Sequence, residues 1–116
     1  MRVLITGGRY YRDEEFVHTV LSQIPVDEII HANCNGADLI ADLWAWSNNI
    51  KITVYKSCWK KYGVLAPVIR NEYMITDSKP DLLIAFPGNE GTQNMIKLAR
   101  KHNLKLIDYN LSEEHQ

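Results

Sequence analysis

The sequence is poor in the residues that cross-link small proteins or hold metal ions. Only two of its 116 residues are cysteine, and Cys34 and Cys58 do not form a CxxC pair. Because the cysteines are far apart and the four histidines show no ligand spacing, we expect neither a disulfide framework nor a metal site. We also expect no cofactor, and this use of cysteine fits a reducing, cytoplasmic compartment.

Long hydrophobic runs are missing as well. The apolar run over residues 81–86 is far shorter than the roughly 20 residues that a membrane-spanning helix needs. The apolar start of the chain leads directly into Gly7 and Gly8, unlike the core of a signal peptide. The sequence therefore predicts no signal peptide and no membrane partner.

Charge of one sign is not in excess, because the formal net charge is −1. This value excludes a global electrostatic attraction to nucleic acid. The two halves of the chain differ, however. Residues 1–50 carry three basic and seven acidic side chains, whereas residues 51–116 carry ten basic and seven acidic ones. A local basic surface in the second half is therefore compatible with the sequence.

What the chain does have is the composition of one ordinary globular domain. It is 46% apolar and 23% charged, without repeats or low-complexity segments, and residues 1–116 are expected to form a single domain. A chain of this size buries about two-thirds of its surface on folding, which suffices without disulfides or metal ions.

Strand-length apolar runs alternate with segments of helical periodicity. The runs cover residues 3–6, 28–31, 52–55, 82–86 and 104–108, and helices are expected over 16–24, 36–48, 65–76 and 92–102, with a loop before the third helix. Several runs are continuously apolar, as strands covered on both faces are. This order predicts an α/β, Rossmann-like domain with a five-stranded parallel sheet of order 3-2-1-4-5, flanked by helices.

In that order the sheet has a switch point between its first and fourth strands, where open α/β sheets bind ligands. A glycine-containing turn follows each of these strands, Thr6-Gly7-Gly8-Arg9 after the first and Pro87-Gly88-Asn89-Glu90-Gly91-Thr92 after the fourth. Glycine lets the backbone approach a ligand, and the N–H groups that open a helix bind anions. Two such turns at one switch point predict a ligand that bears a phosphate.

The standard nucleotide fingerprints are absent. Gly7 and Gly8 lack the third glycine of GxGxxG, and the second strand ends in His31-Ala32-Asn33 where dinucleotide enzymes have a ribose-binding acid. The usual pose of NAD is therefore disfavoured. The sequence also contains no GxxxxGK[ST] motif, which excludes P-loop chemistry on motif grounds.

Four motifs in this order resemble the YspA-like branch of the SLOG superfamily. They are Thr-Gly-Gly-Arg at 6–9, Gly-Ala-Asp at 36–38, Ile-Arg-Asn at 69–71 and Phe-Pro-Gly-x-x-Gly-Thr at 86–92. The superfamily contains Rossmann-like proteins related to the LOG phosphoribohydrolases, to the DNA-processing protein DprA and to ligand-sensing domains of bacterial conflict systems. The resemblance extends over residues 2–109. It implies that a nucleotide or nucleotide derivative binds under the Pro-Gly-x-x-Gly-Thr turn.

Together, the turns and the resemblance assign a set of ligand-binding residues. Gly8, Gly88, Gly91 and Thr92 are expected to hold the phosphate through backbone and hydroxyl donors, and Arg9 to neutralise it. The full set is Gly7, Gly8, Arg9, Asn33, Gly36, Asp38, Arg70, Asn71, Pro87, Gly88, Gly91 and Thr92.

The evidence for catalysis is divided. The glutamate of the LOG motif is replaced here by Met95, which favours a sensor or binding module over the LOG reaction. The alternative is a nucleotide N-glycosidase that uses another carboxylate, with Asp38 and Glu72 as candidates. The structural alternatives are that Asp38 braces a loop and that Glu72 lies on a solvated helix face.

Three further interpretations stay open. Arg70 can reach a ligand, or it can pair with Asp38 or Asp77. His31 is expected more as a hydrogen-bonded edge of the core than as a base. Residues 56–63 mix lysines with aromatics, which is typical both of a lid and of a single-stranded nucleic-acid surface. Relatives in the superfamily often assemble, so a homodimer is a further expected partner.

Overall fold

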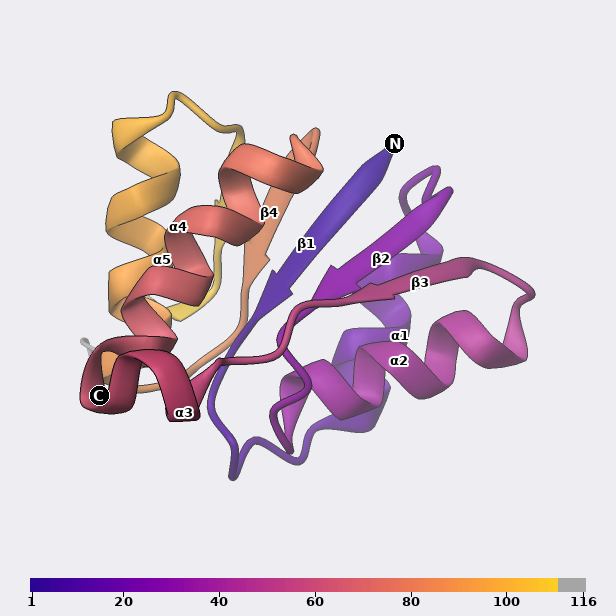
Figure 1. The fold of residues 1–116 in the computed structure, drawn as a ribbon. Helices are drawn as coiled ribbons and strands as arrows, with labels where there is room; N and C mark the ends of the chain where they lie inside the picture. The colour runs from indigo at the N-terminus through magenta and orange to yellow at the C-terminus, as the bar shows by residue number, and fades with distance from the viewer. Residues whose placement is uncertain (111–116) are drawn as a thin grey trace.

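A computed structural model describes residues 1–110 of the chain, except for the side chain of Trp59. It contains one sheet of five parallel strands in the order β3-β2-β1-β4-β5, which confirms the predicted fold class (Figure 1). The strands are β1 (Arg2–Thr6), β2 (Glu28–His31), β3 (Lys51–Val54), β4 (Leu82–Ala85) and β5 (Leu106–Asp108).

Helices cover both faces of the sheet (Figure 1). They are α1 (Glu14–Ser22), α2 (Ala37–Ser47), α3 (Trp59–Tyr62), the 3-10 turn η1 (Gly63–Leu65), α4 (Ala66–Ser78) and α5 (Glu90–Lys101). One core cluster joins α1 and α2 to strand residues such as Val3 and Ile5, and the other joins α4 and α5 to Leu4. The alternation of β1 side chains between two buried faces explains its continuous apolar run.

The central strands β1 and β4 fix the position of the site. Thr6 at the end of β1 pairs with Ala85 at the end of β4, so the two turns that follow leave the sheet side by side. Every residue of β4 is buried, and the interior residues of β1 are buried as well. The turns therefore start from the buried centre of the sheet.

Two local features differ from the prediction. The expected loop before α4 contains the short helix α3 and the turn η1, which continue into α4 with Pro67 in its first turn, a favoured place for proline. Helix α5 begins at Glu90, two residues before the predicted start, so Gly91 and Thr92 lie in its first turn. Within the described part of the chain, no helix is long and apolar enough to cross a bilayer.

Candidate functional site

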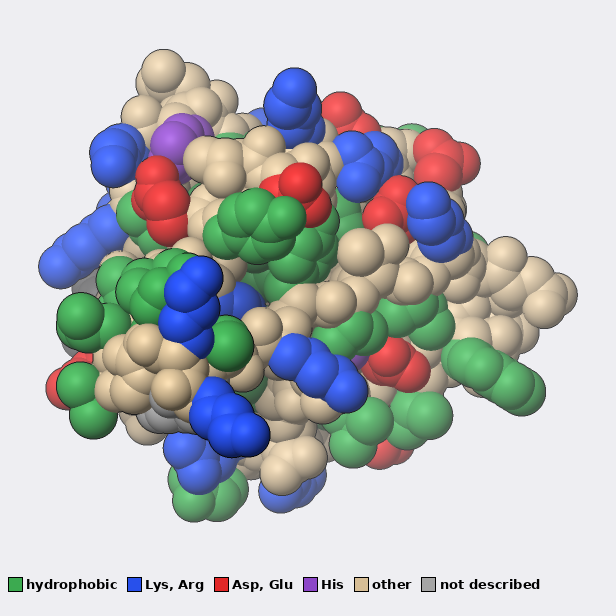
Figure 2. All heavy atoms as spheres, viewed as in Figure 1, with side chains coloured by type: hydrophobic (Ala, Val, Ile, Leu, Met, Phe, Trp, Pro, Cys, Tyr) green, Lys and Arg blue, Asp and Glu red, His purple; other side chains and the backbone are tan. Residues whose placement is uncertain are grey.

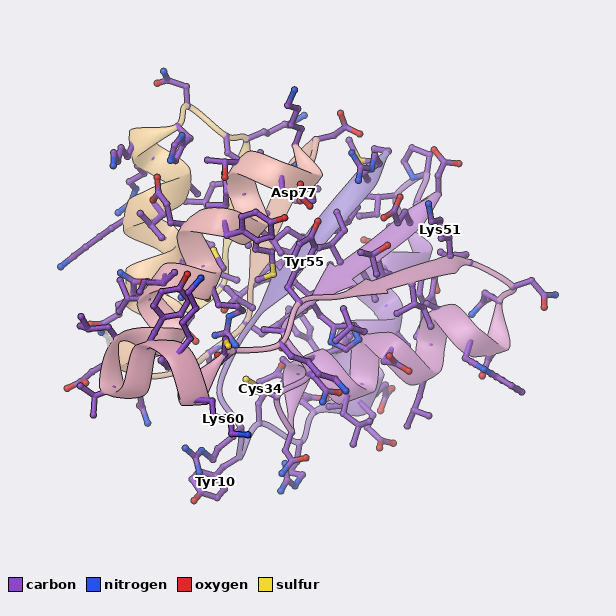
Figure 3. All side chains as sticks on the ribbon, in the orientation of Figure 1. Tyr10, Cys34, Lys51, Tyr55, Lys60 and Asp77 are labelled. Atoms are coloured by element: carbon purple, nitrogen blue, oxygen red, sulfur yellow. The ribbon has the colours of Figure 1, made fainter. Side chains whose placement is uncertain are left out.

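A cavity of about 950 Å³ opens at the carboxyl ends of β1 and β4, where the strand order reverses. Its walls come from the β1–α1 loop, the β2–α2 loop, the segment after β3, and the facing parts of α4 and α5. Nine of the predicted ligand residues line it: Gly7, Gly8, Arg9, Asn33, Asp38, Arg70, Asn71, Gly91 and Thr92. In Figure 3, Tyr10 and Cys34, which also line the cavity, lie at the end of the sheet opposite Lys51.

The two glycine turns are in direct contact. The Gly8 N–H donates to the carbonyl oxygen of Pro87 at 2.9 Å, and a Cβ atom at position 88 would lie 2.6 Å from the Gly8 nitrogen. The turns therefore form one continuous wall, as the switch-point argument requires.

The amide roles predicted for Gly8 and Gly88 need correction. The Gly8 N–H is taken by Pro87, and the Gly88 N–H donates to Oδ1 of Asn110 at 3.0 Å. Both amides are satisfied within the protein, so close packing of the turns accounts for these glycines. Gly88 and Pro87 do not line the cavity, and neither does Gly36, which has φ +80° and packs against the β1–α1 loop.

The first turn of α5 lines the cavity and has no side-chain cap. The first N–H with a helical acceptor is that of Gln93, which donates to the Asn89 carbonyl at 3.0 Å, and the Asn89 side chain does not cap the helix. The N–H groups of residues 90–92 are the ones that an α-helix leaves without helical partners. A Cβ atom at Gly91 would meet nothing within 4 Å, so the fold does not require glycine there. This turn, with the buried Thr92, is the part of the wall whose geometry suits an anion.

Positive charge exceeds negative charge around the cavity. Arg9, Lys56 and Arg70 line it, and none of them forms an ion pair with another residue among 1–110. The Arg9 guanidinium lies 5.8 Å from the centre of the Tyr10 ring. Figure 2 shows Lys and Arg side chains gathered over α3 and the adjoining strand ends. The cavity therefore favours an anionic ligand.

Arg70 pairs with neither Asp38 nor Asp77, the two structural partners considered for it. Its Nη1 donates to Oγ of Ser57 at 2.9 Å and its Nε to Oδ1 of Asn71 at 3.0 Å. Asp77 instead accepts the hydroxyl of Tyr55 at 2.6 Å (Figure 3). Hydrogen bonds to neutral groups hold the guanidinium at the cavity wall with its charge uncompensated by an ion pair.

Asp38 is the acidic group at the cavity that is fully enclosed, with 2% of its surface exposed. Its Oδ2 accepts the N–H groups of Ala32 at 3.1 Å and Cys34 at 3.3 Å, which braces the β2–α2 loop as one of the two interpretations predicted. Its Oδ1 is buried without a hydrogen-bond partner in the described chain. Burial raises the pKa of Asp38 to about 6, against the lowering effect of His31, of those N–H groups and of Arg70.

His31 is a structural residue at the end of β2. Its Nδ1 accepts the Asn33 N–H at 2.9 Å, and its Nε2 lies 2.7 Å from Oδ2 of Asp42. Since Nδ1 acts as an acceptor, the ring proton is on Nε2 and points to Asp42. Both nitrogens are occupied and the ring is buried, which agrees with the interpretation as a core edge.

The second carboxylate candidate lies elsewhere. Glu72 is partly exposed on α4, where its Oε1 is 3.0 Å from Nε2 of His102 and 3.7 Å from Nζ of Lys101, and it does not line the cavity. Glu90 does line the cavity but is exposed. Of the two candidates for acid chemistry, the structure therefore brings only Asp38 to the cavity.

The predicted set of ligand-binding residues omits several residues that line the cavity, among them Tyr10, Cys34, Lys56, Ser57, Asn89 and Gln93. Lys56 and Ser57 follow β3, whose carboxyl end faces the same edge of the sheet, so their position after a predicted strand was an available signal. Their segment was considered as a lid or as a nucleic-acid surface. The side chain of Trp59, central to the second idea, lies outside what the structure describes.

Comparisons with known proteins agree with this architecture. A family model described as "YspA, cpYpsA-related SLOG family" matches residues 1–62. The Gene 61 protein of Mycobacterium phage D29 is 32% identical, over 93% of this chain and 95% of that protein.

Among solved structures, UDP-GlcNAc 2-epimerase from Methanocaldococcus jannaschii matches 93% of this chain, with a TM-score of 0.51 and 18% identity. This chain covers only 31% of that enzyme, and the likeness concerns the Rossmann-like fold alone. The family match and the phage relative together show that the chain belongs to the YspA, cpYpsA-related SLOG family.

Proposed function

We propose that the protein binds a nucleotide or nucleotide derivative through its phosphate in the cavity between β1 and β4. Membership of the SLOG family and the Rossmann-like fold are consistent with nucleotide-related binding. The observation that carries the proposal is the wall itself. It combines the uncapped first turn of α5 with arginine and lysine side chains that form no ion pair with any residue among 1–110.

Electrostatics orient such a ligand within the cavity. The phosphate binds at the first turn of α5, where the N–H groups of residues 90–92 and the Thr92 hydroxyl donate and Arg9 supplies a fixed charge. The carboxylate of Asp38 repels an anion, so it lies beside the sugar rather than beside the phosphate. Arg70 and Asn71, on the facing helix α4, close the other side.

A binding or sensing role fits the chemistry of Met95, which lies on the buried side of α5 three residues after Thr92. Met95, which occupies the place of the LOG glutamate, is 1% exposed and belongs to the apolar core cluster between α4, α5 and the sheet. This position offers neither a proton nor a charge to a ligand. The LOG reaction therefore has no acid or base at its usual place.

Isothermal titration calorimetry against nucleoside mono-, di- and cyclic phosphates tests this proposal, with the matching nucleosides as phosphate-free controls. We expect a phosphorylated ligand to bind and its nucleoside to bind at least tenfold more weakly. Arg9→Ala and Thr92→Val should each weaken the phosphorylated ligand about tenfold, equivalent to about 1.4 kcal/mol. Lys97→Ala, which removes an exposed cation from the same helix α5 away from the cavity, should not. Absence of binding across the panel would contradict the proposal.

A second candidate, N-glycosidic hydrolysis, is favoured by the raised pKa of Asp38. With its pKa raised to about 6 by burial, Asp38 exchanges protons near neutral pH, as a general acid must. The C–N bond would break as Asp38 delivers its proton to the leaving base, and water would add to the anomeric carbon and return a proton to the Asp38 carboxylate. Chromatography of nucleoside monophosphates incubated with the protein tests this. We expect free base from the wild type and none from Asp38→Asn, and activity that survives this substitution would exclude Asp38 as the acid.

A further inference from the structure

One buried atom of Asp38, a residue that lines the cavity, is not explained by the fold. Among the side chains of residues 1–110 that the structure describes, Oδ1 of Asp38 is the buried polar atom without a hydrogen-bond partner. Buried polar atoms in folded proteins are almost always paired, so an exception at a cavity wall calls for a partner from outside the chain. The partner must be a hydrogen-bond donor, because a carboxylate oxygen only accepts.

The carboxylate cannot turn away to find such a donor within the protein. Its Oδ2 is held by two backbone N–H groups, those of Ala32 and Cys34, on the β2–α2 loop. These contacts also fix the direction of Oδ1. The position is therefore preorganised, and a ligand that supplies the donor meets an acceptor already in place.

The packing of the loops places Asp38 close to the phosphate-binding wall. A Cβ atom at Gly7 would lie 2.6 Å from the Cβ of Ala37, the residue before Asp38, and the next residue, Gly8, donates to Pro87 of the other turn. The first turn of α2 is thus in contact with the first glycine turn, which in turn contacts the second. In a nucleotide the group that adjoins the phosphate is the sugar, whose hydroxyls are donors.

We propose that Oδ1 of Asp38 accepts a hydrogen bond from a ribose hydroxyl and makes the site selective for nucleotides that carry this hydroxyl. The inference rests on the proposed nucleotide binding. It adds that the site recognises a ribose hydroxyl of the ligand. A site built around a buried acceptor rejects an analogue that lacks the donor, because the acceptor is then left unpaired.

Asp38→Asn separates this role from the bracing of the loop. The amide oxygen of asparagine can accept the Ala32 and Cys34 N–H groups in place of Oδ2, which directs its NH₂ group to the position of Oδ1. The substitution thus retains the loop contacts and replaces the acceptor with a donor. Asp42→Asn is the matched control, since Asp42 lies one turn further along α2, bonds to His31 and does not line the cavity.

The experiment compares ligands on the wild-type protein before any variant is used. The four ribonucleoside 5′-monophosphates are titrated by calorimetry beside their 2′-deoxy and 3′-deoxy counterparts. We expect removal of one of the two hydroxyls to weaken the best ligand at least tenfold. The same pair of ligands should differ less than threefold on Asp38→Asn and as in the wild type on Asp42→Asn.

Two failures are distinguishable. If the ribonucleotides bind and neither deoxy form is weaker, or if Asp38→Asn retains the full difference, the role of Asp38 is overturned while nucleotide binding stands. If none of these nucleotides binds, both the inference and the proposed function are overturned. Because the ligand comparison needs no variant, a folding defect in Asp38→Asn does not remove the test.

Discussion

A carboxylate is buried at each end of the parallel sheet, and the two carboxylates differ in how completely they are hydrogen-bonded. At the amino end, Glu28 accepts hydrogen bonds from Nε of Arg2 at 3.1 Å and from the Thr53 hydroxyl at 2.7 Å, and Lys51 lies 3.8 Å away. At the carboxyl end, Asp38 has one oxygen bound to backbone N–H groups and one without a partner.

The pKa values of the two groups follow this difference. Burial alone would raise the pKa of Glu28, but the hydrogen bonds from Thr53 and Arg2 and the nearby positive charges lower it below its usual value. Burial raises the pKa of Asp38 to about 6 because the compensation there is incomplete. A fully paired buried carboxylate serves the fold, whereas an incompletely paired one beside a cavity indicates a ligand site.

The largest effect expected from this contrast is a pH-dependent gain in stability for Asp38→Asn. The folded-state pKa of about 6 lies above the ordinary 3.8, so the contribution of protonated Asp38 is complete below pH 4 and is lost as the pH rises through 6. The unfolding free energy of the variant relative to the wild type should rise by roughly 3 kcal/mol between pH 4 and pH 8. Urea denaturation at several pH values measures it, and a difference independent of pH would contradict the assignment.

The glycines of the carboxyl end provide the next test. A Cβ atom at Gly88 would overlap Oγ1 of Thr92 and lie 2.6 Å from the Gly8 nitrogen, so Gly88→Ala should lower the unfolding free energy by about 2–3 kcal/mol. Gly91→Ala is its control, since the space around Gly91 is open. This variant should be at least as stable as the wild type and should bind the nucleotide more weakly. Thermal unfolding and calorimetry measure the two effects, and equal stability losses would refute the distinction.

Glu28→Gln should have a smaller effect of opposite sign to Asp38→Asn. The substitution removes the charge that Arg2 and Lys51 face, and hydrogen bonds to charged groups contribute about 2 kcal/mol. Because the folded-state pKa of Glu28 is lowered, this loss should be complete above the ordinary pKa and fade as the pH falls below it. Nucleotide affinity should not change. A stability loss that persists in acid would show that packing, not charge, accounts for it.

The sequence was sufficient to predict the sheet. Strand order follows from the alternation of apolar runs and helices together with the right-handedness of the crossovers, which leaves little choice for a chain of this length. The position of the cavity followed from that order, since a switch point exists only between β1 and β4. The strand order and the switch point both depend on the order of apolar runs and helical segments, and that order can be seen in the sequence.

The sequence could not predict which acceptor each backbone N–H group of the glycine turns would have. Gly8, Gly88 and Gly91 have the same appearance in a glycine turn, but the amides of Gly8 and Gly88 are taken by Pro87 and Asn110. Asn110 lies beyond β5, and no local pattern links it to Gly88. Asp38 and Glu72 were likewise both candidates on sequence, whereas in the structure the first is buried at the cavity and the second lies beside His102.

The most direct test of the proposed site is a titration of the ¹⁵N-labelled protein followed by the chemical shifts of its backbone amides. We expect one of the ribonucleoside 5′-monophosphates to shift the amides of Glu90, Gly91 and Thr92 most strongly, while those around Glu28 at the other end of the sheet stay unchanged. Inorganic phosphate should shift the same three amides at higher concentration. Shifts confined to other parts of the chain, or none with any of these ligands, would contradict the account.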